Sequence, residues 1–240
     1  MTRFYTFSQA LTNESIEVHD KLVEAFEARD DYDYSAKLDP RRHVPACYVI
    51  YPKLYDYGHA FSRFLHKGET DKFEIDGPQG LGLGLDGSSN GSYLAITAGT
   101  GLLPFMDIVL YLFRRNLKIY GAAINKDFEG IKYEPMDLLG KDFKFELWGN
   151  FRKSEEVIGL KYLLAAAKLS EVSGANNFVL NLRISEEDGS PRWGQDYFAK
   201  KLGDKKFKKA FIRGPQEFNW AVEEMLERCG AGVVDKIIHL

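Results

Sequence analysis

From about residue 92 onward, the sequence predicts an α/β fold built on a doubly wound parallel sheet. Two observations predict it: short apolar runs alternate with helix-length amphipathic stretches, and a glycine turn joins the first such run to the first such stretch. A parallel sheet covered by helices requires this alternation, because each strand is buried on two sides and each helix on one. The expected strands are 93–97, 118–122, 143–149, 178–184 and 210–213.

Three helices are expected between or after these strands. Residues 104–115, 155–169 and 216–229 carry apolar side chains three and four positions apart, the spacing that lines one face of a helix. Gly230 and Gly232 end the last of them. Residues 233–240 leave room for one more short edge strand.

The first ninety residues follow a less regular pattern. Residues 13–29 have helical spacing, whereas 30–42 is charged and turn-prone, as expected of an exposed insert. Six glycines within 77–91 exclude a helix there and mark the natural junction between domains. We therefore expect two units, with the boundaries 1–91 and 92–240 and an insert at about 9–42.

Composition excludes several classes of function. A formal net charge of -3 without a basic stripe argues against a nucleic-acid-binding protein. The one basic cluster is expected to be a solvated surface turn and consists of Lys205, Lys206, Lys208 and Lys209. No apolar run reaches the roughly 20 residues that span a bilayer, so we expect no transmembrane segment here, and membrane contact only through a partner or through missing sequence.

Cysteine usage indicates a reducing compartment. Cys47 and Cys229 are the only cysteines, too few for a disulfide framework and without the paired spacing of a zinc site. We expect no metal. The expected location is the soluble face of the cytoplasm or of an organelle.

The sharpest motif is the segment 95–104, Ala-Ile-Thr-Ala-Gly-Thr-Gly-Leu-Leu-Pro, in which a strand ends at a glycine turn that opens a helix. Backbone amides at such a turn favour a phosphate or diphosphate, which makes Gly99, Thr100 and Gly101 candidate ligand-binding residues. A tight turn that binds nothing would have the same sequence, and the motif alone leaves both interpretations open.

Two further strands end in Gly-Pro. Residues 73–75 lead into Gly77-Pro78-Gln79-Gly80, and residues 211–213 lead into Gly214-Pro215 before the last expected helix. The second turn lies at the carboxyl edge, where open sheets bind ligands. Each one alone is a common turn signal.

In this order, the three motifs resemble the ferredoxin reductase superfamily, and within it the cytochrome b5 reductase and ferric reductase branches. Those proteins carry a Gly-Pro-x-Gly after the flavin barrel, a Gly-Gly-Thr-Gly-Ile-Thr-Pro turn and a Cys-Gly-Pro turn. Their Arg-x-Tyr-Ser/Thr signature is matched by Arg3-Phe4-Tyr5-Thr6, and their Gly-x-x-Ser turn is approached by Gly58 to Ser62. The resemblance covers the chain except about 9–42 and implies a partial antiparallel β-barrel flavin domain before the nucleotide-binding domain.

The resemblance also implies cofactors and roles. FAD would meet Arg3 through its phosphate, Tyr5 through its ring and Thr6 near N5, and Gly58, Ser62, Gly77 and Pro78 complete that site. NADH or NADPH would lie on the glycine turn and on Gly214 and Pro215, with Arg213 in the catalytic place beside the nicotinamide. Hydride would pass from NAD(P)H to FAD, and electrons on to a haem, an iron or an acceptor protein.

Coenzyme choice is expected to follow the strand that ends at Asn150. Arg152 and Lys153 suit the 2'-phosphate of NADPH, whereas Glu155 or Glu156 suits the ribose hydroxyl of NADH. The family places an acidic residue at a similar interval after the same Asn, which favours NADH.

Several departures from the family keep a second hypothesis open. Ala98 and Leu103 replace glycine and threonine, Arg213 replaces the cysteine, and the spacing from Gly58 to Ser62 is one residue longer than expected. The residues before Gly77 predict only the strands 3–8, 47–51 and 73–75, so we expect further sequence or a partner subunit to complete the barrel. The alternative to an enzyme is a catalytically silent accessory or structural subunit, and a nucleotide-binding sensor is a third option.

Overall fold

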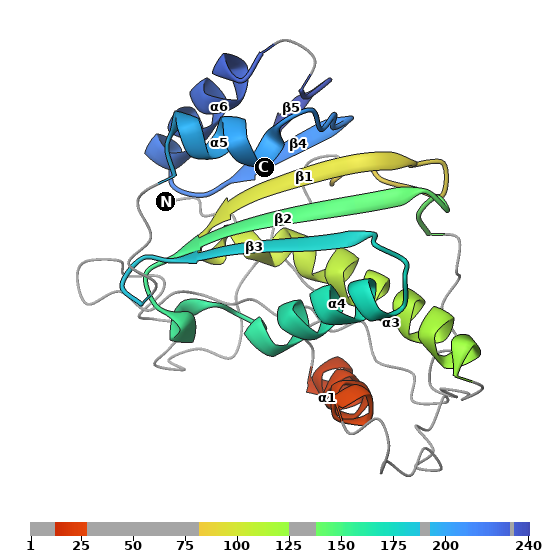
Figure 1. The fold of residues 1–240 in the computed structure, drawn as a ribbon. Coiled ribbons are helices and arrows are strands. Elements are labelled where there is room, and N and C mark those ends of the chain that lie inside the picture. Colours follow the sequence, from red (N-terminus) through yellow and green to blue (C-terminus); the bar gives the residue numbers. More distant parts are fainter. Residues whose placement is uncertain (1–12, 28–81, 125–137, 188–192, 231–232) are drawn as a thin grey trace, which may run out of the picture.

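The computed structural model describes residues 13–27, 82–124, 138–187, 193–230 and 233–240 (Figure 1). Its centre is a five-stranded sheet in the order β3-β2-β1-β4-β5, and every strand pair is parallel. The strands are β1 Gly91–Ala98, β2 Phe143–Phe151, β3 Phe178–Ile184, β4 Lys209–Arg213 and β5 Ile237–His239. The predicted α/β class and parallel sheet are confirmed, and residues 237–239 form the additional edge strand.

Helices cover both faces of the sheet. Helices α3 (Met106–Ala123) and α4 (Leu160–Val172) lie on one face, and α5 (Gln195–Leu202) and α6 (Gln216–Arg228) lie on the other (Figure 1). Strand β1 contributes side chains to the hydrophobic core on each face of the sheet. Tyr93 and Ala95 pack towards α3 and α4, while Leu94 and Ile96 pack towards α5 and α6. Burial on both sides explains why this strand reads as a continuous apolar run.

The predicted strand at 118–122 is wrong, because these residues form the end of α3. Leu117 and Gly121 are buried one helical turn apart, and Ile119 between them is exposed. Helical spacing therefore continues past residue 115, and the β-branched and aromatic residues of this stretch misled the prediction. Helix α5 was missed, since it is only eight residues long and its core contribution is Phe198 and Leu202.

The predicted helix at 155–169 begins later than expected. A short 3-10 turn, η3 (Ser154–Glu156), follows β2, and α4 starts only at Leu160. Gly159 explains the delay, because its φ of 71° is left-handed backbone that interrupts a right-handed helix.

Helix α1 (Asn13–Glu27) confirms the helical spacing of the N-terminal stretch and forms an extra layer beneath α3 and α4 (Figure 1). Leu22, Val23 and Phe26 are buried in the core that these helices share with the sheet. Polar contacts accompany this packing, since Arg114 Nε donates to Nε2 of the fully buried His19 at 3.0 Å. On α4, Lys161 pairs with Asp20 at 2.6 Å.

Candidate nucleotide site at the carboxyl edge of the sheet

The sheet reverses its winding between β1 and β4. The chain leaves β1 through η1 (Gly99–Phe105) towards α3 on one face, and it leaves β4 directly into α6 on the other face (Figure 1). The two strands are neighbours, with Thr97 paired to Arg213. Open α/β sheets bind ligands in the crevice that such a reversal creates at the carboxyl ends of the strands.

The turn after β1 has the conformation that its glycines predict. Gly99 has a φ of 55°, and a Cβ built on it would have no atom of the described residues within 4 Å. Thr100 is exposed, and no side chain caps the start of η1. Thr97 is anchored beneath the turn, because its Oγ1 donates to the carbonyl of Trp148 at 3.1 Å. The hydrogen bond of Thr97 thus anchors the turn to β2, and no described residue covers the turn at Gly99.

Gly101 also lies where the turn after β1 meets the turn after β4. A Cβ on Gly101 would lie 2.2 Å from the carbonyl oxygen of Arg213, and a Cβ on Gly214 would lie 3.1 Å from the Cβ of Ala98. The turns after β1 and β4 therefore pack directly against each other. The missing side chain of Gly101 therefore makes room for the neighbouring turn, and the expectation that Gly101 also lets a ligand approach the backbone stays a prediction.

Arg213 ends β4 on the side of α3, with its Cγ 3.1 Å from the position of a Cβ on Gly101. Its side chain is partly buried, and its guanidinium makes no hydrogen bond or ion pair with the residues that the structure describes. Burial lowers the pKa of Arg213, but a guanidinium remains charged at every physiological pH. Among the residues that the structure describes, this cation has no counter-charge beside the turn.

A second group of charged side chains lies where β2 and β3 end. Asn150 pairs in register with Arg183, and Arg183 Nη1 donates to Asn150 Oδ1 at 3.0 Å. Arg152 Nε contacts Glu186 at 3.0 Å, and Lys153 Nζ lies 3.9 Å from the same carboxylate. Both basic residues proposed for a 2'-phosphate thus share one acidic partner.

The two glutamates proposed for the ribose differ in their surroundings. Glu156 accepts a hydrogen bond from the backbone amide of Arg152 at 3.3 Å, whereas Glu155 is exposed. Sequence reasoning missed Arg183 and Glu186. An arginine inside a predicted buried strand was the available signal for Arg183, and the acidic pair that directly follows the same strand was the signal for Glu186.

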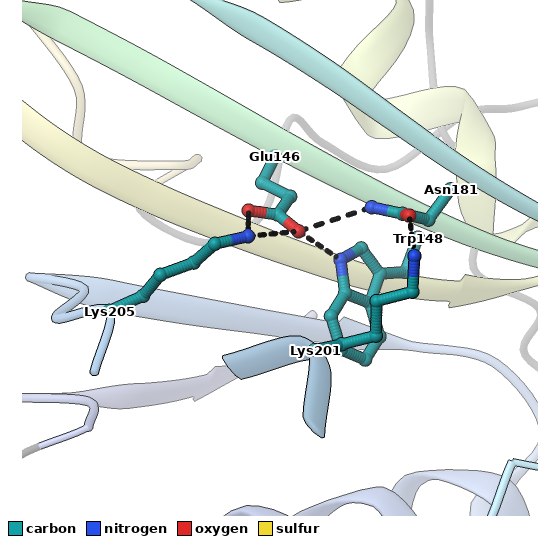
Figure 2. A network of polar contacts seen from close by, with 5 residues as sticks. All are labelled: Glu146, Trp148, Asn181, Lys201 and Lys205. Atoms are coloured by element: carbon teal, nitrogen blue, oxygen red, sulfur yellow. Dashed lines mark hydrogen bonds and ion pairs between the residues drawn. The ribbon is translucent and has the colours of Figure 1, made fainter. Parts of the chain in front are cut away.

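A buried carboxylate stands on β2, on the face covered by α5. Glu146 Oε1 accepts from Trp148 Nε1 at 2.8 Å and from Asn181 Nδ2 at 3.1 Å, and Lys205 Nζ contacts Glu146 Oε2 at 2.9 Å. Figure 2 shows the carboxylate between Lys205 on one side and Trp148 and Asn181 on the other. Hydrogen bonds and an opposite charge compensate the cost of burying this charge.

Two members of the surface lysine cluster expected from the sequence also have partners. Lys205 neutralises Glu146, and Lys209 Nζ donates to the carbonyl of Gly84 at 2.7 Å. These lysines connect the segment around β4 to β2 and to the chain before β1. No local sequence pattern predicts these contacts.

Four aromatic rings cluster beside this network, between β2 and α5. Trp193 stacks on Tyr197 with ring centroids 5.9 Å apart, and Trp148 meets Trp193, Tyr197 and Phe198 edge-on. Burial raises the pKa of Tyr197, and the nearby charge of Glu146 acts in the same direction. Tyr197 stays neutral, so the cluster offers aromatic surface rather than an acid or base.

The flavin residues expected from the sequence lie outside the described residues. They are Arg3, Tyr5, Thr6, Gly58, Ser62, Gly77 and Pro78, together with the strands expected at 3–8, 47–51 and 73–75. Within the described part of the chain, no group of His, Cys, Asp and Glu has the arrangement of a metal site. None of the helices described is long and apolar enough to cross a bilayer.

Comparison with known proteins finds similarity at the level of structure. No family model and no curated protein matches the sequence. Ferredoxin-NADP+ reductase from Plasmodium falciparum with 2'P-AMP aligns with 62% of this chain and 53% of its own, at 15% identity and a TM-score of 0.38. The cytochrome b5 reductase domain of Ulva prolifera nitrate reductase aligns with 64% of this chain and 49% of its own, at 16% identity and a TM-score of 0.39.

The chain spans about half the length of these solved structures.

Proposed function

We propose that this chain carries the pyridine-nucleotide-binding half of a flavin-dependent NAD(P)H oxidoreductase. The observation that carries the proposal is the meeting of two glycine turns at the reversal of the sheet. Among the described residues, the surface at Gly99 is open and the neighbouring Arg213 has no ion-pair partner. A diphosphate fits this donor set, because backbone amides and a guanidinium both bind phosphate oxygens. Residues 1–91 would supply part of the flavin-binding half.

The chain's own residues would bind and orient the coenzyme. The turn at 99–101 would hold the diphosphate, and Asn150 and the ends of β2 and β3 would meet the adenosine. Hydride acceptance and the release of single electrons to a haem or iron acceptor are the chemistry that FAD supplies when bound. The protein need contribute no acid or base for that step.

Coenzyme choice under this proposal follows from Glu186. Its carboxylate already holds Arg152 and Lys153, so a 2'-phosphate would have to displace it and would then face its negative charge. Exposed Glu155 adds a further negative charge at the same end. NADH is therefore the favoured coenzyme.

Isothermal calorimetry of the full chain with NADH, NADPH and ADP tests the proposal. Binding of NADH, and weaker binding of NADPH, is the expected result, and the absence of heat with all three nucleotides would rule the proposal out.

The second candidate function is an accessory subunit without catalysis. Arg213 favours it, because a long cation beside the nicotinamide position would obstruct the ring or repel its oxidised, positive form. Purified protein distinguishes the two: yellow protein that is bleached by NADH supports the reductase, and colourless protein that binds no flavin supports the subunit.

A further inference from the structure

Helix α6 exposes a tryptophan at its outer face. The Trp220 side chain is 59% accessible, while Val222 and Leu226 of the same helix are buried against the sheet. Trp220 is the most exposed large hydrophobic residue in the part of the chain that the structure describes. Exposed tryptophan is unfavourable in a lone monomer and frequent at the centre of binding surfaces.

The surroundings of Trp220 are acidic. Residues three, four and seven positions away share its helix face, and they include the acidic residues Glu217, Glu223, Glu224 and Glu227. Arg228 is the only basic residue of α6, and it contacts Glu224. This face concentrates negative charge in a chain whose whole net charge is -3.

A hollow open to solvent adjoins the tryptophan. It is lined by Gly214, Gln216, Asn219, Trp220, Glu223 and His239. His239 Nε2 lies 3.2 Å from Glu223, so the pair joins the end of β5 to α6 at the rim. Through Gly214 the hollow reaches the turn after β4, which places it beside the candidate nucleotide site.

We propose that this face, formed by Trp220, Glu217, Glu223 and Glu224 and here called the α6 face, docks a basic protein surface. An arginine or lysine of the partner would lie over the Trp220 ring, an arrangement that aromatic rings favour. The surrounding carboxylates would attract further basic residues and steer the encounter. Nothing in this docking requires a nucleotide, so it stands or falls separately from the proposed function.

The test uses cytochrome c, a small basic haem protein, as the probe of a cationic surface. Calorimetry with the full chain at low ionic strength is expected to show binding that weakens steeply with added salt. Trp220→Ala should weaken this binding about tenfold. The matched control is Leu164→Ala, which removes a 53% exposed side chain from α4 on the opposite face of the sheet and should leave binding unchanged.

The double variant Glu217→Gln, Glu224→Gln separates charge from ring contact. It should also weaken binding and should flatten the salt dependence, while Glu171→Gln on α4 removes one exposed charge elsewhere and should do neither. Failure to bind cytochrome c at low salt, or equal binding by Trp220→Ala and the parent, overturns the proposal. A dimer of the parent that Trp220→Ala dissociates also overturns it and assigns the face to a second copy of this chain.

Discussion

The backbone carbonyl of Arg213 fills the space that a side chain at position 101 would need, only 2.2 Å from an ideal Cβ on Gly101. The two turns that frame the candidate site are therefore one packed unit, although more than a hundred residues separate them. Its geometry depends on both strands, because neither turn can move without the other.

Gly101→Ala should destabilise the fold itself. The added methyl meets backbone on β4, which cannot rotate away, so we expect a loss at the upper end of the roughly 1–3 kcal/mol typical of overpacking. Gly174→Ala is the control. Gly174 has a φ of 72° and no described atom within 4 Å of an added Cβ, so that change costs only about 1–2 kcal/mol of backbone strain. Urea unfolding measures both losses. Equal losses would contradict the packing of the two turns.

Gly99→Leu should abolish nucleotide binding without unfolding the protein. A side chain at Gly99 enters the open surface where the diphosphate is proposed to lie. Gly174→Leu places the same side chain at another left-handed glycine with open surroundings, far from the carboxyl edge. Calorimetry with NADH should separate the two variants, and parent-like affinity in Gly99→Leu would remove the diphosphate from this turn.

Arg213→Met should weaken the binding of NADH and ADP by about ten- to a hundredfold, the equivalent of losing one charge-assisted hydrogen bond of about 1.5–3 kcal/mol. The thermal midpoint should stay the same or rise, because the change removes a partly buried cation that has no ion-pair partner among the described residues. Lys168→Met removes an exposed cation from α4 and should change neither quantity. If Arg213→Met bound NADH more tightly, the arginine would instead be an obstruction.

Glu146→Gln should cost about 1–3 kcal/mol of stability, because Lys205 loses its counter-charge inside a hydrogen-bonded network. Lys205 remains partly exposed and can recover water, which keeps the loss below that of a fully buried pair. Glu171→Gln, which breaks the exposed pair with Lys168, should cost less than about 1 kcal/mol. If the urea midpoint fell equally in the two variants, the Glu146 network would contribute no more to stability than an exposed ion pair does.

Acid should weaken the docking of α1. Burial by itself raises the pKa of Asp20, but hydrogen bonds from Lys161 and Tyr162 outweigh it and hold that pKa below its ordinary value of 3.8. A depressed carboxyl pKa stabilises the fold above the unfolded-state value, and this contribution is lost as pH falls through the folded-state value. The parent should therefore exceed Asp20→Asn in urea midpoint at pH 7, and the gap should shrink below about pH 4. A gap independent of pH would contradict this linkage.

The sequence by itself determined the class of the fold and the place of its first turn. Apolar runs such as 93–97 and 143–149 are largely buried between the helix layers, so they can be recognised without any knowledge of their neighbours. The turn at Gly99 was equally visible, because left-handed backbone selects glycine locally. The spacing of apolar residues along α6 and α1 predicted which side of each helix faces the core, because apolar residues repeat at the helical period on the buried face.

Only the tertiary structure decided which distant residues meet. The pairing of Lys205 with Glu146, of Arg152 with Glu186, and of Gly101 with the Arg213 carbonyl joins segments that no spacing rule connects. The end of α3 was also decided there, because residues 118–122 suit a strand by local preference but continue a helix whose other turns are buried. The local sequence pattern indicates whether a residue is buried or exposed. Ion pairs and contacts between distant backbone segments depend instead on chain topology, which brings together groups far apart in sequence.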